Sequence, residues 1–228
     1  MNRRALVAKG IRDVLPMFVP AIPFALVLGV VIDESGLGHL LGWMSSPLMF
    51  GGAAQITLLS LLGEGASVAA AVSAALIVGS RHLLYSANLA PYFQQQPAWF
   101  RWVGPYMLID QVFALALLHK DLDARSFRTY YLTAGLLFWF LWLAFTALGV
   151  VIGPQVPAQW KLAFAAPVLF VGLVVVGVDR WQKALVALSG AALTFLLASL
   201  PSGSGMLIAA IAAIGIGMVA DSLFRTKR

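Results

Sequence analysis

Cysteine is absent from the 228-residue chain, and charged residues make up only 11% of it. Without cysteine the chain has no disulfide, thiol nucleophile or thiolate metal site. A soluble domain carries roughly a quarter charged residues, so this shortage, beside 61% hydrophobic residues, indicates a membrane protein. The patterns HExxH, CxxC, GxSxG and the phosphate-binding P-loop are also missing. We therefore expect no enzymatic activity, no cofactor and no metal.

The few charges are unevenly distributed. The net charge is +6, but most basic residues stand at the ends of apolar segments rather than in one patch. This is the pattern of cytoplasmic loops in an integral membrane protein, so we expect a lipid bilayer and no nucleic acid as the surroundings. Basic residues before the first apolar run and after the last place both termini in the cytoplasm. The first run has no clean cleavage site and is predicted to stay as a membrane-spanning helix of an inner-membrane protein.

The apolar runs predict an all-α, polytopic bundle that forms one transmembrane domain over residues 1–228. A spanning helix needs about 20 mostly apolar residues. Residues 34–46 are predicted as an external loop, and the runs give about seven or eight spans. Alternatively, 47–62 and 66–80 form a re-entrant hairpin from the outside, and six spans plus this hairpin give the same loop polarity. The predicted runs are 14–33, 47–62, 66–80 (which can continue to about 91), 103–119, 131–152, 162–178, 184–200 and 206–223.

The chain contains a weak internal repeat. Residues 51–65 align without gaps to 189–203, with seven of fifteen positions identical, although chance similarity is a risk in so Ala-, Leu- and Gly-rich a chain. Repeats at about 14–119 and 160–224 would begin on opposite sides of the membrane, as in the inverted repeats of many secondary transporters.

Two prolines fall inside the first apolar run. Pro20 and Pro23 each remove a helix hydrogen bond, so the helix is predicted to break or kink there. Within a bilayer a break is tolerated only where protein or a water-filled cavity satisfies the freed carbonyls. An ordinary proline kink is the alternative.

Three polar side chains fall within apolar runs. Counted along the predicted helices, Gln55, Arg81 and Asp110 lie about 10–15 Å below the outer end of each span. We expect Arg81 and Asp110 to pair, or a solute to bridge them. The alternatives are that Arg81 snorkels from the end of a shorter helix, and that Gln55 only joins helices by hydrogen bonds.

Gly51 and Gly52 precede Gln55. A helix that begins there would offer N–H groups and partial positive charge to a carboxylate, although close helix packing explains the glycines equally well. Other candidates for coupling or secondary contacts carry weaker signals. His82 is a candidate proton carrier or a hydrogen-bonding spacer, and the remaining members of this group are Tyr85, Glu64, Asn88 and Gln111.

Four elements together resemble one family. They are the proline-rich first run, GGAAQ at 51–55, Arg-His-x-Leu-Tyr at 81–85 and IDQVFAL at 109–115. In order and spacing they are similar to the AzlC-type branched-chain amino-acid permeases. The resemblance implies export of branched-chain amino acids or related small solutes, together with a small membrane subunit of the AzlD type. Gln111 departs from the acidic residue that the family usually has there, which leaves proton coupling in question.

The predicted function is therefore a proton-coupled secondary transporter subunit for an amino acid or a similar small zwitterion. Arg81 or the helix-end N–H groups would meet the carboxylate, and Asp110 would hold Arg81 or meet the amine. Three alternatives stay open: a non-transporting membrane scaffold, a permease for another small polar solute, and an intramembrane enzyme, for which the sequence offers no persuasive nucleophile or acid pair.

Overall fold

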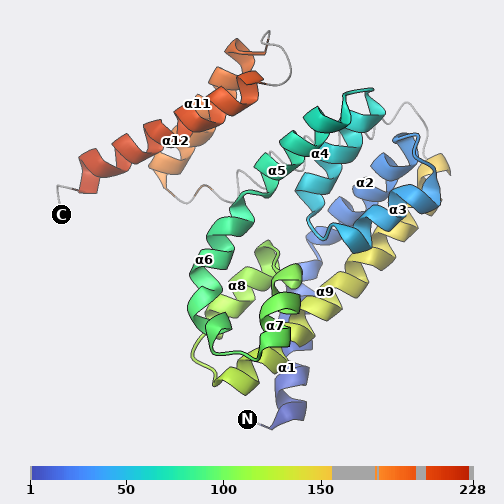
Figure 1. Cartoon of the computed structure of the whole chain (residues 1–228), viewed down its shortest axis with the longest axis vertical. Coiled ribbons are helices and arrows are strands. Elements are labelled where there is room, and N and C mark those ends of the chain that lie inside the picture. The colour runs from blue at the N-terminus through green and yellow to red at the C-terminus, as the bar shows by residue number, and fades with distance from the viewer. Residues whose placement is uncertain (1, 156–177, 179, 199–203, 226–228) are drawn as a thin grey trace. The chain divides into compact units, whose positions relative to one another are not determined.

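A computed structural model describes residues 2–155, 178, 180–198 and 204–225, and every regular element in these ranges is helical (Figure 1). The predicted all-α class is confirmed. The chain divides into two compact units, Met1–Ala166 and Pro167–Arg228, each of which is described by itself. The prediction of a single domain over 1–228 stays a prediction.

The first unit is organised along helix α9, Ala124–Ile152, which contacts both α1, Arg3–Phe18, and α2, Ala21–Glu34 (Figure 1). Asp123 caps α9, since its carboxylate accepts the N–H groups of Arg125 and Ser126 at 3.1 Å each. These hydrogen bonds, led by those of Ser126, hold the pKa of Asp123 below its ordinary value. α9 contains no proline, so it continues unbroken for 29 residues.

The prolines of the first apolar run stand where the helix breaks. α1 ends at Phe18, α2 begins at Ala21, and their axes differ by 65°. Pro20 is the N-cap of α2, and Pro23 lies in its first turn, where a missing N–H leaves no helix bond unmade.

Three further interruptions divide the rest of the unit into short helices. Residues 49–51 separate α3 from α4, α5 bends by 41° into α6, and extended backbone at Leu108 and Ile109 precedes α8. The bounds are α3 His39–Leu48, α4 Gly52–Gly63, α5 Val68–Gly79, α6 Arg81–Gln94, α7 Ala98–Val103, the 3₁₀ helix η1 Gly104–Met107, and α8 Asp110–Leu118.

Three segment predictions are wrong. Residues 34–46 are not a loop, because α3 begins at His39. The run 66–91 is not one helix, because it bends at the Gly79–Ser80 pair, a common place for a kink. The run 103–119 is not one helix either, since Pro105 falls in η1 and α8 begins only at Asp110.

Within the described residues, α9 alone is long and apolar enough to cross a membrane unaided. Counting each of the bent pairs α1–α2 and α5–α6 as one span raises the number to three. The shorter apolar helices are Gly52–Gly63, Trp181–Leu196 and Ile208–Leu223. The predicted seven or eight spans therefore stay a prediction. Most of the predicted span at 162–178, which carries the first part of the second repeat, lies outside the described residues.

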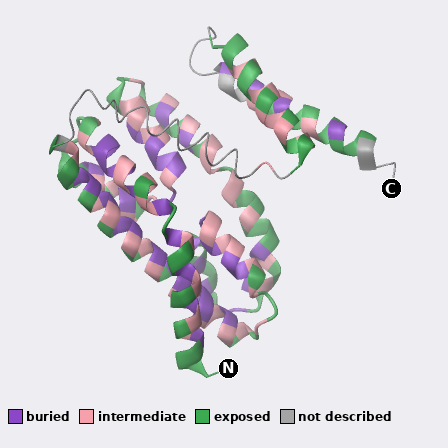
Figure 2. Ribbon diagram, turned by 180° about the vertical axis from the view of Figure 1, so that it is seen from behind, coloured by how far each residue is buried: buried purple, intermediate pink, exposed green. Residues whose placement is uncertain are grey.

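The second unit contributes two described helices, α11, Trp181–Leu196, and α12, Ser204–Arg225, which pack against each other. Small residues form this contact: a Cβ on Gly190 would lie 3.4 Å from that of Ala213. In the first unit, buried residues line the facing sides of the helices, while large apolar side chains such as Leu40, Leu48 and Trp102 are exposed (Figure 2). We expect such surfaces to face lipid or another membrane protein.

The contact between α2 and α9 depends on two glycines. A Cβ on Gly29 would lie 2.4 Å from the carbonyl oxygen of Thr146, and one on Gly149 would lie 2.3 Å from that of Leu26. Backbone atoms cannot rotate away as side chains do, so neither position accepts even a methyl group without moving a helix. Small residues that allow such approach are a general device of membrane helix packing.

We predict that Gly29→Ala and Gly149→Ala each destabilise the protein by about 1–3 kcal/mol or more, the cost of overpacking a tight contact. Thermal unfolding in detergent, followed by size-exclusion chromatography, measures this. Gly215→Ala in α12 is the matched control, because nothing lies within 4 Å of a Cβ there. Equal melting temperatures for all three variants would contradict this account of the α2–α9 contact.

Candidate functional site

Arg81 and Asp110 are each the first residue of a helix, α6 and α8, and their side chains meet. Arg81 Nη1 lies 3.3 Å from Asp110 Oδ2. A carboxylate is favoured at a helix N-terminus, whereas a cation there is not, so Arg81 depends on the carboxylate more than Asp110 depends on the guanidinium. The pairing predicted for these two residues is present.

Tyr85 completes this group. It lies one turn after Arg81 on the same face of α6, and its hydroxyl donates to Asp110 Oδ1 at 2.6 Å. Its ring stacks on Phe113 of α8, with centroids 4.3 Å apart and an angle of 15° between the planes. One oxygen of Asp110 therefore faces Tyr85 and the other faces Arg81. We call Arg81, Tyr85 and Asp110 the charged triad.

The triad keeps unused hydrogen-bonding capacity. Arg81 Nε is buried without a partner, although a guanidinium has five N–H donors. The Arg81 and Asp110 side chains are 35% and 41% exposed, so the pair is reachable from outside the chain. A buried donor without an acceptor is costly, and an anionic ligand would satisfy it. In the described part of the chain, Trp142 Nε1 is the other buried side-chain donor without a partner.

α4 begins at Gly52, with Gly51 as its N-cap, so the predicted helix start is where the glycines stand. A Cβ on Gly52 would lie 2.6 Å from a ring carbon of Phe24 and 2.8 Å from one of Trp142, whereas one on Gly51 would meet nothing within 4 Å. This geometry supports close packing as the role of Gly52. Close packing does not explain why residue 51 is a glycine.

Gln55 is fully buried in the first turn of α4. In the amide orientation that satisfies both ends, its oxygen accepts from the hydroxyls of Ser45 and Ser46 at 2.7 and 2.8 Å, and its nitrogen donates to the carbonyl of Met49 at 3.3 Å. These partners belong to α3 and the turn that follows it. The contacts support the structural alternative for Gln55, in which the amide ties α4 to α3.

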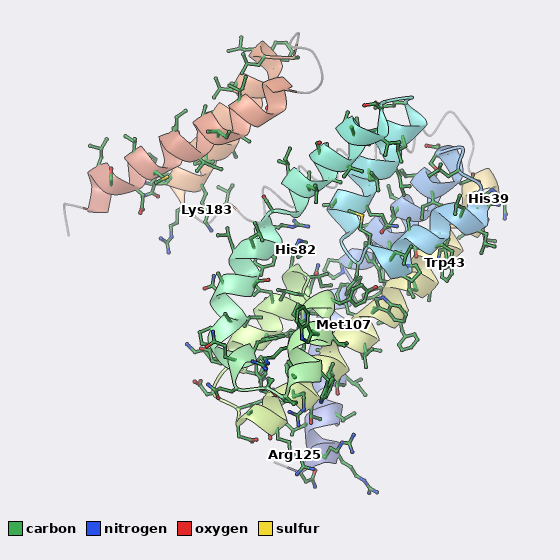
Figure 3. The ribbon with its side chains drawn as sticks, in the orientation of Figure 1. His39, Trp43, His82, Met107, Arg125 and Lys183 are labelled. Carbon is green, nitrogen blue, oxygen red and sulfur yellow. The ribbon has the colours of Figure 1, made fainter. Side chains whose placement is uncertain are left out.

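The weaker candidates separate into two groups. His82 lies beside the triad at the start of α6, where Nδ1 contacts the carbonyl of Gly79 at 2.8 Å and its ring meets the Tyr85 ring edge-on (Figure 3). Gln111 follows Asp110 in α8 and is half-buried. Asn88 is exposed and donates to the carbonyl of Leu84, and Glu64 is exposed at the end of α4.

The depths predicted for Arg81 and Asp110 below the ends of their spans are not supported by the structure. The prediction assumed that Arg81 and Asp110 lie well inside continuous helices, but each begins a helix after an interruption. The two meet because two helix starts converge, not because two long helices place them at one level.

A second polar group was missed from the sequence, where His119 seemed isolated. The carboxylate of Asp13 in α1 accepts hydrogen bonds from Lys9 Nζ at 3.1 Å and from the Tyr130 hydroxyl at 2.8 Å. It also lies 3.5 Å from His119 Nε2. We call these four residues the Asp13 cluster. The spacing of Lys9 and Asp13, i and i+4, was the only local signal.

These features define an α-helical membrane protein with charged residues at the interruptions of its helices. The model of the AzlC protein family matches residues 16–156, which contain the charged triad and His119, and the chain therefore belongs to the AzlC family.

Two curated relatives extend this similarity over most of the chain. An uncharacterized membrane protein of Archaeoglobus fulgidus is 27% identical over 217 residues, which cover 93% of this chain and 94% of the relative. The inner membrane protein YgaZ of Escherichia coli K12 is 27% identical over 205 residues, or 85% of this chain and 82% of YgaZ. No solved structure matches.

The contacts of Gln55 make a prediction. Gln55→Leu keeps most of the side-chain volume but leaves the Ser46 hydroxyl and the Met49 carbonyl without this partner, so we expect a loss of stability of about 1–3 kcal/mol. Gln95→Leu, at an exposed glutamine near the end of α6, is the control and should change little. Melting temperatures in detergent test this. An unchanged melting temperature with lost transport would instead make Gln55 a solute contact.

Proposed function

We propose that the protein is a secondary transporter subunit that exports branched-chain amino acids or similar small zwitterions across the bacterial inner membrane. The charged triad is the observation that carries the proposal: an ion pair between two helix starts, with a buried guanidinium donor left over. Membership of the AzlC family supports a membrane role.

The triad has the charges that an amino acid requires. A carboxylate would bind the Arg81 guanidinium, whose planar fork suits two parallel hydrogen bonds. The ammonium group of the same solute would bind Asp110, which is already oriented by Tyr85. Without solute, Arg81 and Asp110 neutralise each other. The solute would replace one ion pair by two, so no charge is left alone in an apolar chain.

The surroundings of the triad suit an apolar side chain. The stacked rings of Tyr85 and Phe113 lie beside the Asp110 carboxylate and are only partly buried, so they leave some aromatic surface to a ligand. A branched aliphatic side chain would gain about 25 cal/mol for each Å² that it buries there. Charge at one end and an aromatic surface beside it favour a small amphipathic zwitterion over an inorganic ion.

Interrupted helices are a usual device for transport. Their half-helix ends and freed backbone groups form substrate sites near the middle of the membrane, around which one part of the bundle moves against another. Here the interruptions before α6 and α8 carry the two charged residues themselves, so a change in the bend angle would change the distance between the charges.

Five further features belong to the proposal. Both termini lie in the cytoplasm, protons drive export, and the chain catalyses no reaction and needs no cofactor. A small membrane subunit of the AzlD type covers part of the exposed apolar surface.

We predict that Arg81→Ala abolishes export while the protein still reaches the membrane. The measurement is the efflux of labelled leucine or valine from preloaded cells that express the chain together with its small subunit. Arg125→Ala is the matched control, because Arg125 is exposed in the first turn of α9, a helix that carries no residue of the triad, and should be dispensable. Normal efflux from the Arg81 variant would end the proposal.

A charge exchange separates pairing from solute binding. Arg81→Asp combined with Asp110→Arg keeps the ion pair but reverses the charges that the solute meets. We expect folded protein without export. If each single variant loses assembly with the small subunit and the exchange restores both assembly and export, the pair is structural and the solute binds elsewhere.

A further inference from the structure

The Asp13 cluster joins three parts of the first unit. Lys9 and Asp13 belong to α1, His119 follows the last residue of α8, and Tyr130 belongs to α9. The His119 ring also lies against the Tyr130 ring, with centroids 4.2 Å apart. Asp13 is thus the common acceptor through which the end of α8 is attached to α1.

The two contacts of His119 depend differently on its protonation. Nδ1 lies 2.9 Å from the carbonyl of Leu115, which can only accept, so this bond needs a proton on Nδ1 and is open to the neutral ring as well as to the imidazolium. Nε2 lies 3.5 Å from the Asp13 carboxylate. This second contact is an ion pair only when His119 is protonated.

α8 is therefore held by a carboxylate contact at each end. At its start, Asp110 binds Arg81 and Tyr85, and just past its end His119 binds Asp13. The helix is nine residues long, or about 13 Å, and contains no interruption. A rigid element of this length passes a displacement at one end to the other.

We infer that His119 is a protonation-dependent positioning residue: its imidazolium ties the end of α8 to Asp13, and loss of the proton releases that end. For its link to transport, the inference rests on the proposed function. Histidine is suited to this because its charge ordinarily changes between about pH 5 and 8. The tie is present at low pH and lost as the pH rises.

The other groups that face His119 make release inexpensive. When the proton leaves for water, Asp13 keeps Lys9 Nζ and the Tyr130 hydroxyl as partners, so the carboxylate does not become unpaired. Neutral His119 keeps its Nδ1 bond to Leu115. What is lost is the ion pair between the end of α8 and α1, while the direct packing of the two helices stays. In the transport cycle this would place the coupled proton at His119 and transmit its presence to Asp110 through α8.

The tie can be tested without transport. Because the chain lacks cysteine, Ala116→Cys introduces a single thiol in the last turn of α8 at a position that is 1% exposed. Leu118→Cys, at a position that is 71% exposed, corrects for the pH dependence of the labelling reaction itself. We expect the maleimide labelling rate at 116 relative to 118 to rise about fivefold from pH 5.5 to 8, the order expected for the loss of one partly exposed ion pair. In the His119→Gln background the ratio should not change with pH.

Transport gives the second measurement. His119→Gln should flatten the dependence of efflux on cytoplasmic pH, whereas a purely structural role would lower efflux by the same factor at every pH. His39→Gln is the matched control, since His39 also contacts an aspartate, Asp33, but joins α3 to α2 away from α8 (Figure 3). It should leave the pH profile unchanged.

The outcomes separate the two proposals. A labelling ratio independent of pH in the otherwise wild-type chain overturns the inference about His119, whatever transport shows. A rising ratio without amino-acid efflux supports the tie and overturns the proposed function alone. A rising ratio together with a pH profile that His119→Gln leaves intact overturns the role of His119 in coupling.

Discussion

Every interruption of a helix in an apolar chain frees backbone carbonyls that lipid cannot satisfy, and most of the site follows from this constraint. Polar side chains meet such carbonyls close to the interruptions. Gln55 donates to Met49 between α3 and α4, His82 lies against Gly79 at the bend into α6, and Tyr131 of α9 donates to Gly104 of η1. The Tyr106 hydroxyl donates to Pro47 at the end of α3. Several polar residues that stand out in the sequence therefore serve to satisfy backbone carbonyls where helices are interrupted.

This constraint sorts the candidate residues. Gln55 and His82 have partners in their own chain that account for their polarity. Arg81 does not, because the ion pair with Asp110 leaves Nε buried and unpaired. A residue whose polar groups are already satisfied gains little from a solute, whereas one with a free donor gains a hydrogen bond. The chemistry is therefore concentrated on fewer residues than the sequence pattern indicates.

The sequence was sufficient for the helical class, for the family and for the pairing of Arg81 with Asp110. Composition and motif order carry the first two, and the third follows from the cost of an unpaired charge in an apolar chain. The interruptions were harder. The prolines near position 20 predict one interruption. The bend at Ser80 and the extended residues before Asp110 have no such signal, because they occur within continuously hydrophobic runs. Hydrophobicity indicates whether a segment is buried or faces lipid, but not the direction of its backbone. The depth of a residue below the end of a span, counted along an assumed helix, is therefore wrong where that helix is interrupted.

The Asp13 cluster lay beyond sequence reasoning for a different reason: Asp13 and Tyr130 are 117 positions apart, and apart from the spacing of Lys9 and Asp13 no pattern in the chain marks the members as neighbours. The cluster and the charged triad nevertheless have the same design, an aspartate that accepts both a tyrosine hydroxyl and a cationic side chain. They differ in what completes them. Asp13 is supplied with donors from α1, α9 and the end of α8, whereas the triad keeps a guanidinium donor unpaired and is partly exposed. α8 lies between a carboxylate with three donors and a triad whose guanidinium keeps one donor unpaired. The proposed solute site is therefore at the Asp110 end, and the proposed protonation-dependent tie is at the Asp13 end.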